Sequence, residues 1–231
     1  FLAENELRDH LLEIDRRRRF RYESIYFDTA DWASYLGAAR RRPRRFKVRT
    51  RNYLDSDQCL LEVKVRDHRG NTVKHRHPYG TTDRHRLSSE GREFVAGVDA
   101  VGPHSDRLAP TLTVSYVRST LLLDGARDRV TVDEAVTWST GDGTALGLDG
   151  LALVETKTAG PPSALDRVLW RAGHRPVTIS KYCTGIALVR SDLPANKWHR
   201  VLHRHVAPHL TVHAPPAPWS TPAPLLQDGS S

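Results

Sequence analysis

The segment RRFKVRTRNY at positions 44–53 alternates cations with apolar or β-branched residues. In a β-strand, successive side chains point to opposite faces, so the cations at its odd positions would share one face. Like charges in a row repel one another, so negative charge from the protein or from a ligand should compensate them. The row is either a solvated sheet face or an anion site where guanidinium and ammonium groups converge on phosphates. Its members are Arg45, Lys47, Arg49 and Arg51.

Further predicted strands also place charged residues on one face and apolar residues on the other. Antiparallel meanders with this pattern are typical of barrels, so we predict an α+β fold: an antiparallel β-barrel with helices packed outside. The charges could line the lumen, or they could lie outside an ordinary apolar barrel, which composition favours. In the first orientation the lumen holds Lys47, Arg49, Arg51, Lys64, Arg118, Arg129, Lys181, Glu62, Asp133 and Glu155.

Periodicity and capping residues predict the elements around these strands. We expect helices over Glu4–Ile14, over Asp31–Ala39 with Asp31 as cap, over Ser163–Ala172 with Ser163 as cap and Gly173 as stop, and over Asn196–His205. Asp124-Gly125 predicts a hairpin, and Ser180-Lys181-Tyr182 predicts a short extended piece. The predicted strands cover residues 24–29, 44–53, 58–66, 72–79, 112–123, 129–133 and 151–157.

Composition narrows the partners and the location. The 231 residues carry a formal net charge of +8, which favours nucleic acid, phosphates or an acidic surface as partner. Cys59 and Cys183 have no metal-ligand spacing, so we expect a reducing, cytoplasmic location. No apolar run reaches membrane-spanning length, and no signal peptide is visible. The aromatics do not interleave with the basic segment, which disfavours nucleic acid.

Six segments together resemble a known family. They are KVRTRNY (47–53), LEVK (61–64), YVR (116–118), RVTVD (129–133), LVETK (153–157) and SKY (180–182). In this order they resemble the VTC domain (vacuolar transporter chaperone), the polyphosphate-polymerase branch of the triphosphate tunnel metalloenzymes. The resemblance implies a tunnel-like barrel with a basic lining. It also implies a VTC-like domain over residues 1–192 that lacks the family's first strand. From the residues themselves we expect a helical extension over 193–213 and a disordered tail over the Pro-rich segment 214–231.

The same resemblance implies roles for individual residues. The catalytic cations would hold a nucleoside triphosphate, such as ATP, and a growing polyphosphate chain, with Lys157 as a further ligand. Glu155 would coordinate Mn²⁺ or Mg²⁺, because hard cations prefer carboxylate oxygens. Glu62 could pair with Lys64 or an arginine, or support a ligand-binding residue from behind. Asp133 could act in the same supporting way or be a structural partner of Arg129. The implied catalytic cations are Lys47, Arg49, Arg51, Lys64, Arg118, Arg129 and Lys181.

Three functions are compatible with this site. The first is a nucleotide-dependent polyphosphate polymerase, and the second is a triphosphate or nucleotide hydrolase in which water replaces the phosphate acceptor. The third is a non-catalytic module that binds polyphosphate. A carboxylate such as Glu155 among the cations favours catalysis.

His199 and His203 have the i, i+4 spacing of residues on one face of a helix, but a solvent-exposed helix explains them better than a zinc site. Oligomeric state stays open.

Overall fold

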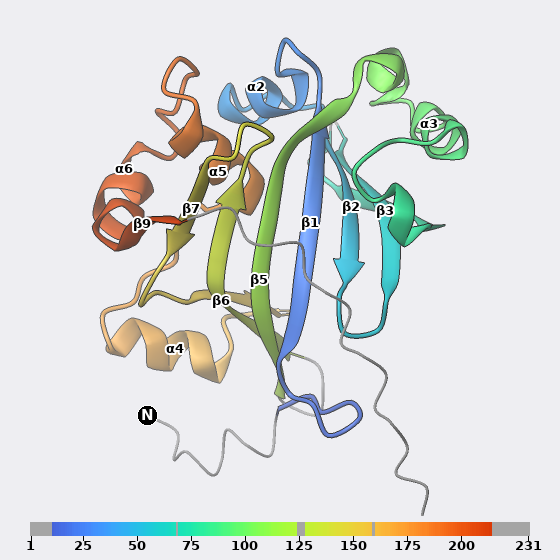
Figure 1. The fold of residues 1–231 in the computed structure, drawn as a ribbon. Coiled ribbons are helices and arrows are strands. Elements are labelled where there is room, and N and C mark those ends of the chain that lie inside the picture. Colours follow the sequence, from blue (N-terminus) through green and yellow to red (C-terminus); the bar gives the residue numbers. More distant parts are fainter. Residues whose placement is uncertain (1–10, 68, 124–127, 159, 214–231) are drawn as a thin grey trace, which may run out of the picture.

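The computed structural model describes residues 11–67, 69–123, 128–158 and 160–213. Within these ranges nine strands form one antiparallel sheet, in the order β4-β3-β2-β1-β5-β6-β7-β9 with β8 paired to β6 (Figure 1). The strands are β1 (Phe20–Asp28), β2 (Arg45–Tyr53), β3 (Gln58–Arg66), β4 (Thr72–Tyr79), β5 (Ala109–Leu123), β6 (Asp128–Ser139), β7 (Ala145–Leu148), β8 (Leu153–Lys157) and β9 (Leu210–His213).

The predicted antiparallel α+β architecture is confirmed, but hydrogen bonds do not close the described strands into a barrel. Strand β6 is the branch point, because residues 136–139 pair with β7 and residues 129–133 pair with β8. Strand β8 thereby lies across from β3, where Glu155 on β8 interacts electrostatically with Lys64. The sheet is open and curved. Among the described residues, no backbone hydrogen bonds join its two edges across the concave side.

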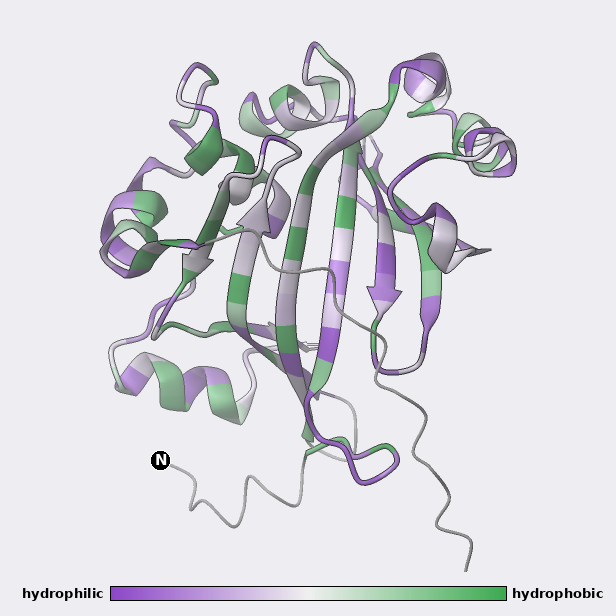
Figure 2. Ribbon diagram, viewed as in Figure 1, coloured by the Kyte–Doolittle hydropathy of each residue, from purple (hydrophilic) through white to green (hydrophobic). Residues whose placement is uncertain are grey.

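The convex face of β1–β3 is apolar, as the alternation predicts. It is covered by α3 (Ser89–Ala96) and the 3₁₀ segment Gly102–Arg107 (Figure 1). Colouring by hydropathy shows the alternation along the strands (Figure 2). Burial of this face stabilises the sheet in proportion to the apolar area removed from water. The buried cluster includes Ile25, Phe27, Phe46, Val48, Leu61, Val63, Val95, Val98 and Val101.

The concave face is only partly charged. Helix α5 (Lys181–Val189) packs against one part of it and forms a second core with aromatic side chains of the sheet. Tyr26 and Tyr182 stack with their ring centroids 4.9 Å apart. Only the part of the concave face that α5 leaves uncovered keeps its cations. The core includes Tyr26, Leu112, Val114, Tyr116, Trp138, Tyr182, Ile186 and Trp198.

The prediction that residues 180–182 are extended is wrong, because α5 starts at Lys181. The Ser180 side chain accepts a hydrogen bond from the Cys183 amide, which caps the helix. Gly185 allows close contact, since a Cβ there would lie 2.3 Å from Trp138 Cδ1. Glycine and β-branched residues weaken the local helix signal of this segment, and packing overrides it.

The helix α2 (Ala33–Ala39) begins two residues later than predicted, and Asp31 is not its cap. The buried carboxylate of Asp28 accepts hydrogen bonds from the amides of Ser34 and Tyr35, at 2.8 and 2.9 Å. Tyr182 donates its hydroxyl to the same carboxylate at 2.5 Å. Asp28 thus ties the start of α2 to α5, a long-range contact that residue spacing cannot predict.

Two other sequence predictions concern the chain start and the hairpin. Residues 4–10 of the predicted first helix lie outside the described residues, and residues 11–14 are not helical. The Leu12 amide instead donates to the Thr120 carbonyl at 2.8 Å, so this segment runs beside β5. The predicted Asp124-Gly125 turn lies outside the described residues, although β5 and β6 pair as a hairpin requires.

The later helices follow their capping residues. Helix α4 (Ala164–Arg171) has Ser163 in a capping box with Asp166, and Gly173 has φ +88° just after its end, as predicted. The segment 193–213 is helical only in part, with α6 (His199–Val201), a π-turn over Leu202–Val206 and a 3₁₀ turn over Ala207–His209. It ends in β9, which pairs with β7. The predicted tail, 214–231, lies outside the described residues.

Candidate anion-binding site

A cavity of about 880 Å³ lies between the concave face of β2–β3 and a second wall built from β8, α4 and the segment before α5. Nine Lys and Arg and four carboxylates line it. Burial in such a space strengthens electrostatic interactions relative to water. The cations are Lys47, Arg49, Arg51, Lys64, Lys74, Arg118, Lys157, Arg175 and Lys181, and the carboxylates are Glu62, Asp133, Glu155 and Asp166.

Eight of the nine site residues expected from the sequence line this cavity. The exception is Arg129, which is exposed and is not among the lining residues. Arg129 lies directly opposite the lining residue Lys157 in the β6–β8 register, but Arg129 itself does not line the cavity. The eight that meet there are Lys47, Arg49, Arg51, Lys64, Arg118, Lys157, Lys181 and Glu155.

Glu62 is the centre of the first ion-pair cluster. It is 2 % exposed and lies opposite Arg49 in the β2–β3 register. Arg49 donates to its Oε2 from Nε at 2.8 Å and from Nη2 at 2.6 Å, and Lys74 donates to its Oε1 at 3.1 Å. Burial alone would raise the pKa of Glu62, but Arg49, Arg51 and Lys74 outweigh it and hold the pKa at about 2. Glu62 pairs with arginine, as one expectation had it, and not with Lys64.

Asp133 is the centre of the second cluster. Arg118 donates to Asp133 from Nε at 2.6 Å and from Nη2 at 2.8 Å, and the Lys181 ammonium donates to the same carboxylate. Burial would raise the pKa of Asp133, but the hydrogen bond from Arg118 and the charge of Lys181 lower it. The expectation that Asp133 is a partner of Arg129 is wrong, because the neighbouring strand β5 brings Arg118 directly opposite it.

Lysine faces lysine beside the Glu62 cluster. Lys47 lies opposite Lys64, which lies opposite Lys74 on β4. Burial and the charge of Lys47 lower the pKa of Lys64, against the weaker influence of Glu155. Within the described part of the chain, no hydrogen bond or ion pair reaches Lys64, whereas Lys47 donates to Ser180 Oγ at 2.7 Å. A phosphate group in this position would relieve the repulsion.

Arg51 also lacks a carboxylate partner among the described residues. Its Nη2 donates to the Tyr116 hydroxyl at 2.9 Å, and its buried Nε has no acceptor there. An unpaired buried guanidinium nitrogen costs free energy unless a ligand supplies the acceptor. Together with Lys64, Arg51 marks the places where the cavity has donors in excess.

The second wall of the cavity is partly apolar. Helix α4 is amphipathic, with hydrophilic and hydrophobic residues on different sides (Figure 2). None of its residues is fully buried, because its apolar side faces the cavity, where Leu169 and Trp170 line it with Val177. The Arg175 guanidinium lies over the Trp170 ring, 6.0 Å from its centroid. The helix is held to β8 by the Thr156 hydroxyl, which donates to Asp166 at 2.8 Å.

The carboxylates of the cavity differ in how freely they could bind a metal ion. The oxygens of Glu62 and Asp133 are engaged by cations, whereas Glu155 is half exposed and has Lys157 at 3.3 Å. Burial opposes ionisation of Glu155, but Lys157, Lys181 and Arg118 lower its pKa. The described residues contain no group of three or more His, Cys, Asp or Glu suited to a metal. A hard cation at Glu155 would therefore take its remaining ligands from phosphate oxygens and water.

The site includes residues that sequence reasoning missed. Tyr26 accepts a hydrogen bond from Arg49 Nη1 at 3.0 Å, and Arg49 and Lys47 lower its pKa although burial acts in the opposite direction. Lys74 follows from the register of the predicted β3–β4 hairpin, so that signal was available. Trp170 and Arg175 had no such signal, because only tertiary structure places α4 opposite β2.

The family model of the VTC domain matches residues 4–190, which is most of the chain. The chain belongs to the VTC domain family. The resemblance stated from the six segments is thereby confirmed. No curated protein matches the sequence. In this VTC domain, no helix among the described residues is long and apolar enough to cross a membrane.

Solved structures resemble this VTC domain at low sequence identity. A proposed adenylyl cyclase from Hippeastrum, described as having a dominant triphosphatase activity, has a TM-score of 0.51 and 18% identity over 84% of this chain and 91% of its own. The PH1819 protein from Pyrococcus horikoshii has a TM-score of 0.45 and 12% identity over 81% and 91% of the two chains. The first of these likenesses supports the shared antiparallel fold.

Proposed function

We propose that this VTC domain is a polyphosphate polymerase that transfers the terminal phosphoryl group of a nucleoside triphosphate to a phosphate chain. The observation that carries the proposal is that two groups of cations, from different elements of the fold, line one cavity. Lys47, Arg51 and Lys64 come from β2 and β3, whereas Arg118 and Lys181 come from β5 and α5. Transfer between two polyanions needs two such groups, one for the donor and one for the acceptor.

The reaction requires positioning and charge neutralisation more than covalent catalysis. A terminal oxygen of the acceptor chain forms the new P–O bond as the bond to the bridging oxygen of the nucleotide breaks, and the nucleoside diphosphate leaves with that electron pair. Arg51 Nε and Lys64 offer donors that the protein itself leaves unused among the described residues. Held in place by the sheet, they favour the charge distribution of the transition state without reorganising.

A divalent cation, Mn²⁺ or Mg²⁺, would be held by Glu155 and would neutralise phosphate charge when bound. We expect Glu155→Gln to abolish metal-dependent turnover and to leave metal-free binding of tripolyphosphate unchanged in calorimetry. Glu134→Gln is the control, since Glu134 lies on the neighbouring strand β6 in a surface pair with Arg19. Full turnover in the Glu155 variant would show that Glu155 serves only as an ion-pair partner of Lys157.

The apolar wall favours a nucleotide over bare triphosphate as donor. Trp170 and Leu169 offer the nucleoside a surface that a phosphate chain cannot use. Stacking of a base on an aromatic side chain contributes roughly 1–3 kcal/mol. We expect Trp170→Ala to weaken ATP binding about tenfold and to leave tripolyphosphate binding unchanged. An equal loss for both ligands would contradict a role in binding the nucleoside.

Hydrolysis is the alternative, and a triphosphatase activity is described for the Hippeastrum protein. The deciding experiment incubates the protein with ATP and Mn²⁺ and sizes the phosphate products on a gel. We expect ADP together with chains longer than triphosphate. Orthophosphate as the only phosphate product would favour the hydrolase, and tight polyphosphate binding without ADP release would favour a binding module.

A further inference from the structure

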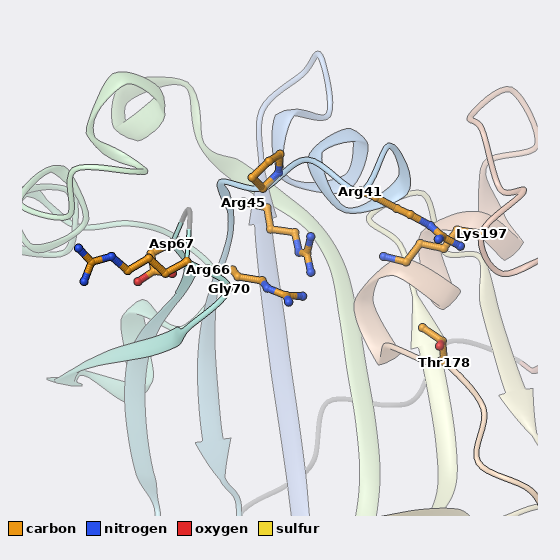
Figure 3. A pocket seen from close by; sticks show the side chains of 9 residues that line it. Arg41, Arg45, Arg66, Asp67, Gly70, Thr178 and Lys197 are labelled. Atoms are coloured by element: carbon orange, nitrogen blue, oxygen red, sulfur yellow. The ribbon is translucent and has the colours of Figure 1, made fainter.

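A second cavity, of about 610 Å³, lies at the end of the sheet where β2 begins and β3 ends. Arg45 and Arg66 are paired across the two strands there. Both side chains extend from the sheet toward Lys197, whose ammonium points back toward them (Figure 3). Five cations and one carboxylate line the cavity, namely Arg41, Arg45, Arg66, Arg69, Lys197 and Asp67.

Two cations of this second cavity donate hydrogen bonds to backbone carbonyls. Arg45 donates to the Arg42 carbonyl at 2.9 Å, and Lys197 donates to the Ala38 carbonyl at 2.8 Å. Burial and the charge of Arg66 lower the pKa of Arg45. Burial and the charges of Arg45, Lys47 and Arg41 likewise lower the pKa of Lys197. The positive charge here is therefore in excess, and an anion would stabilise it.

The second cavity continues the cation row of the first. Arg45 precedes Lys47 on the same face of β2, and Arg66 follows Lys64 on the same face of β3. The segment before α5 lines both cavities, with Val177 and Ile179 in the first and Thr178 in the second. From Arg51 to Arg45 the row extends about 20 Å at the usual strand rise. A triphosphate whose phosphates lie at Arg51 does not span this distance to Arg45.

We propose that the second cavity binds the far segment of a phosphate chain whose reacting end lies in the first cavity. The proposal rests on the function proposed above and adds a consequence for the substrate, since only chains longer than triphosphate engage both cavities. Affinity then rises with chain length, and Arg45 and Arg66 determine that rise. The same phosphate chemistry could come from a separate small anion, such as orthophosphate, and the test distinguishes the two sources.

The test compares binding of orthophosphate, tripolyphosphate and long-chain polyphosphate by calorimetry, without nucleotide or metal. The variant is Arg45→Gln/Arg66→Gln. The matched control is Arg44→Gln/Arg86→Gln, which removes the same net charge from two exposed arginines that line neither cavity. We expect long-chain affinity to fall at least tenfold in the variant, with tripolyphosphate affinity within twofold of wild type and no change in the control.

Two outcomes would overturn the proposal. Long-chain affinity that equals that of wild type would show that the second cavity does not bind the chain. Orthophosphate binding that is lost in the variant while long-chain affinity stays the same would assign the cavity to a separate small anion. Failure of the proposed function has a different signature, because wild-type protein would then bind no tripolyphosphate or would form no chains from ATP.

Discussion

The two halves of the cation row on β2 and β3 are built differently. At Arg49 the row is neutralised from within, because Glu62 is buried on the opposite strand and accepts two hydrogen bonds from that guanidinium. At Lys47 the opposite residue is Lys64, and at Arg45 it is Arg66. Arg49 and Glu62 in the first half hold the sheet together, whereas the second half, like Arg51, keeps its positive charge for a ligand. A row of cations in a sequence can thus combine a structural ion pair with a binding surface.

The sharpest test of this difference removes Glu62. Glu62→Gln leaves Arg49 buried without its counter-charge, and loss of one partner of a buried pair costs about 3–5 kcal/mol. We expect a loss of that size in the free energy of unfolding, measured by urea denaturation. Glu134→Gln should cost less than about 1 kcal/mol, because Glu134 and Arg19 are both largely exposed. Equal losses in the two variants would contradict a special role for Glu62.

Lowering the pH should destabilise the fold through the same ion pair, because it protonates Glu62. The folded protein holds the pKa of Glu62 at about 2, below its ordinary value of 4.5. A lowered carboxyl pKa stabilises the fold above the ordinary pKa, and this contribution is lost as pH falls from about 4.5 through about 2. We expect a loss on the order of 3 kcal/mol over this window. Unfolding of Glu62→Gln at several pH values should show a weaker dependence, and an unchanged slope would contradict the assignment.

In the other half of the row, removing a charge should weaken ligand binding without lowering the stability of the fold. Lys64→Met removes a cation that repels Lys47 and that makes no ion pair within the described residues. We expect tripolyphosphate affinity to fall by about 1.5–3 kcal/mol, the contribution of a charge-assisted bond. The thermal midpoint should stay the same or rise, because repulsion is relieved. A large loss of stability in this variant would make Lys64 structural, like Glu62, and would remove the contrast between the halves.

Local patterns in the sequence determined several strands, the ends of one helix and the family of this protein. Alternation in residues 44–53 and 58–66 predicted two strands and the faces of their side chains, because a strand has a strict period of two. Ser163 and Gly173 predicted the start and end of α4, because capping satisfies backbone groups within a few residues. The order of six short segments was sufficient to identify the VTC domain family. The same alternation places the cations that β2 contributes to the main cavity on one face of that strand.

Only the tertiary structure decided how the charges are paired and where the cavity ends. Asp133 and Arg129 share one face of β6, but the partners of Asp133 come from β5 and α5, since β5 pairs with β6 and α5 crosses the concave face. The helical state of residues 181–189 depends on contacts of Gly185 and Tyr182 with residues far away in sequence. Ion pairs and packing depend on distance in space, and a period of two or 3.6 carries no information about which distant strand or helix lies opposite.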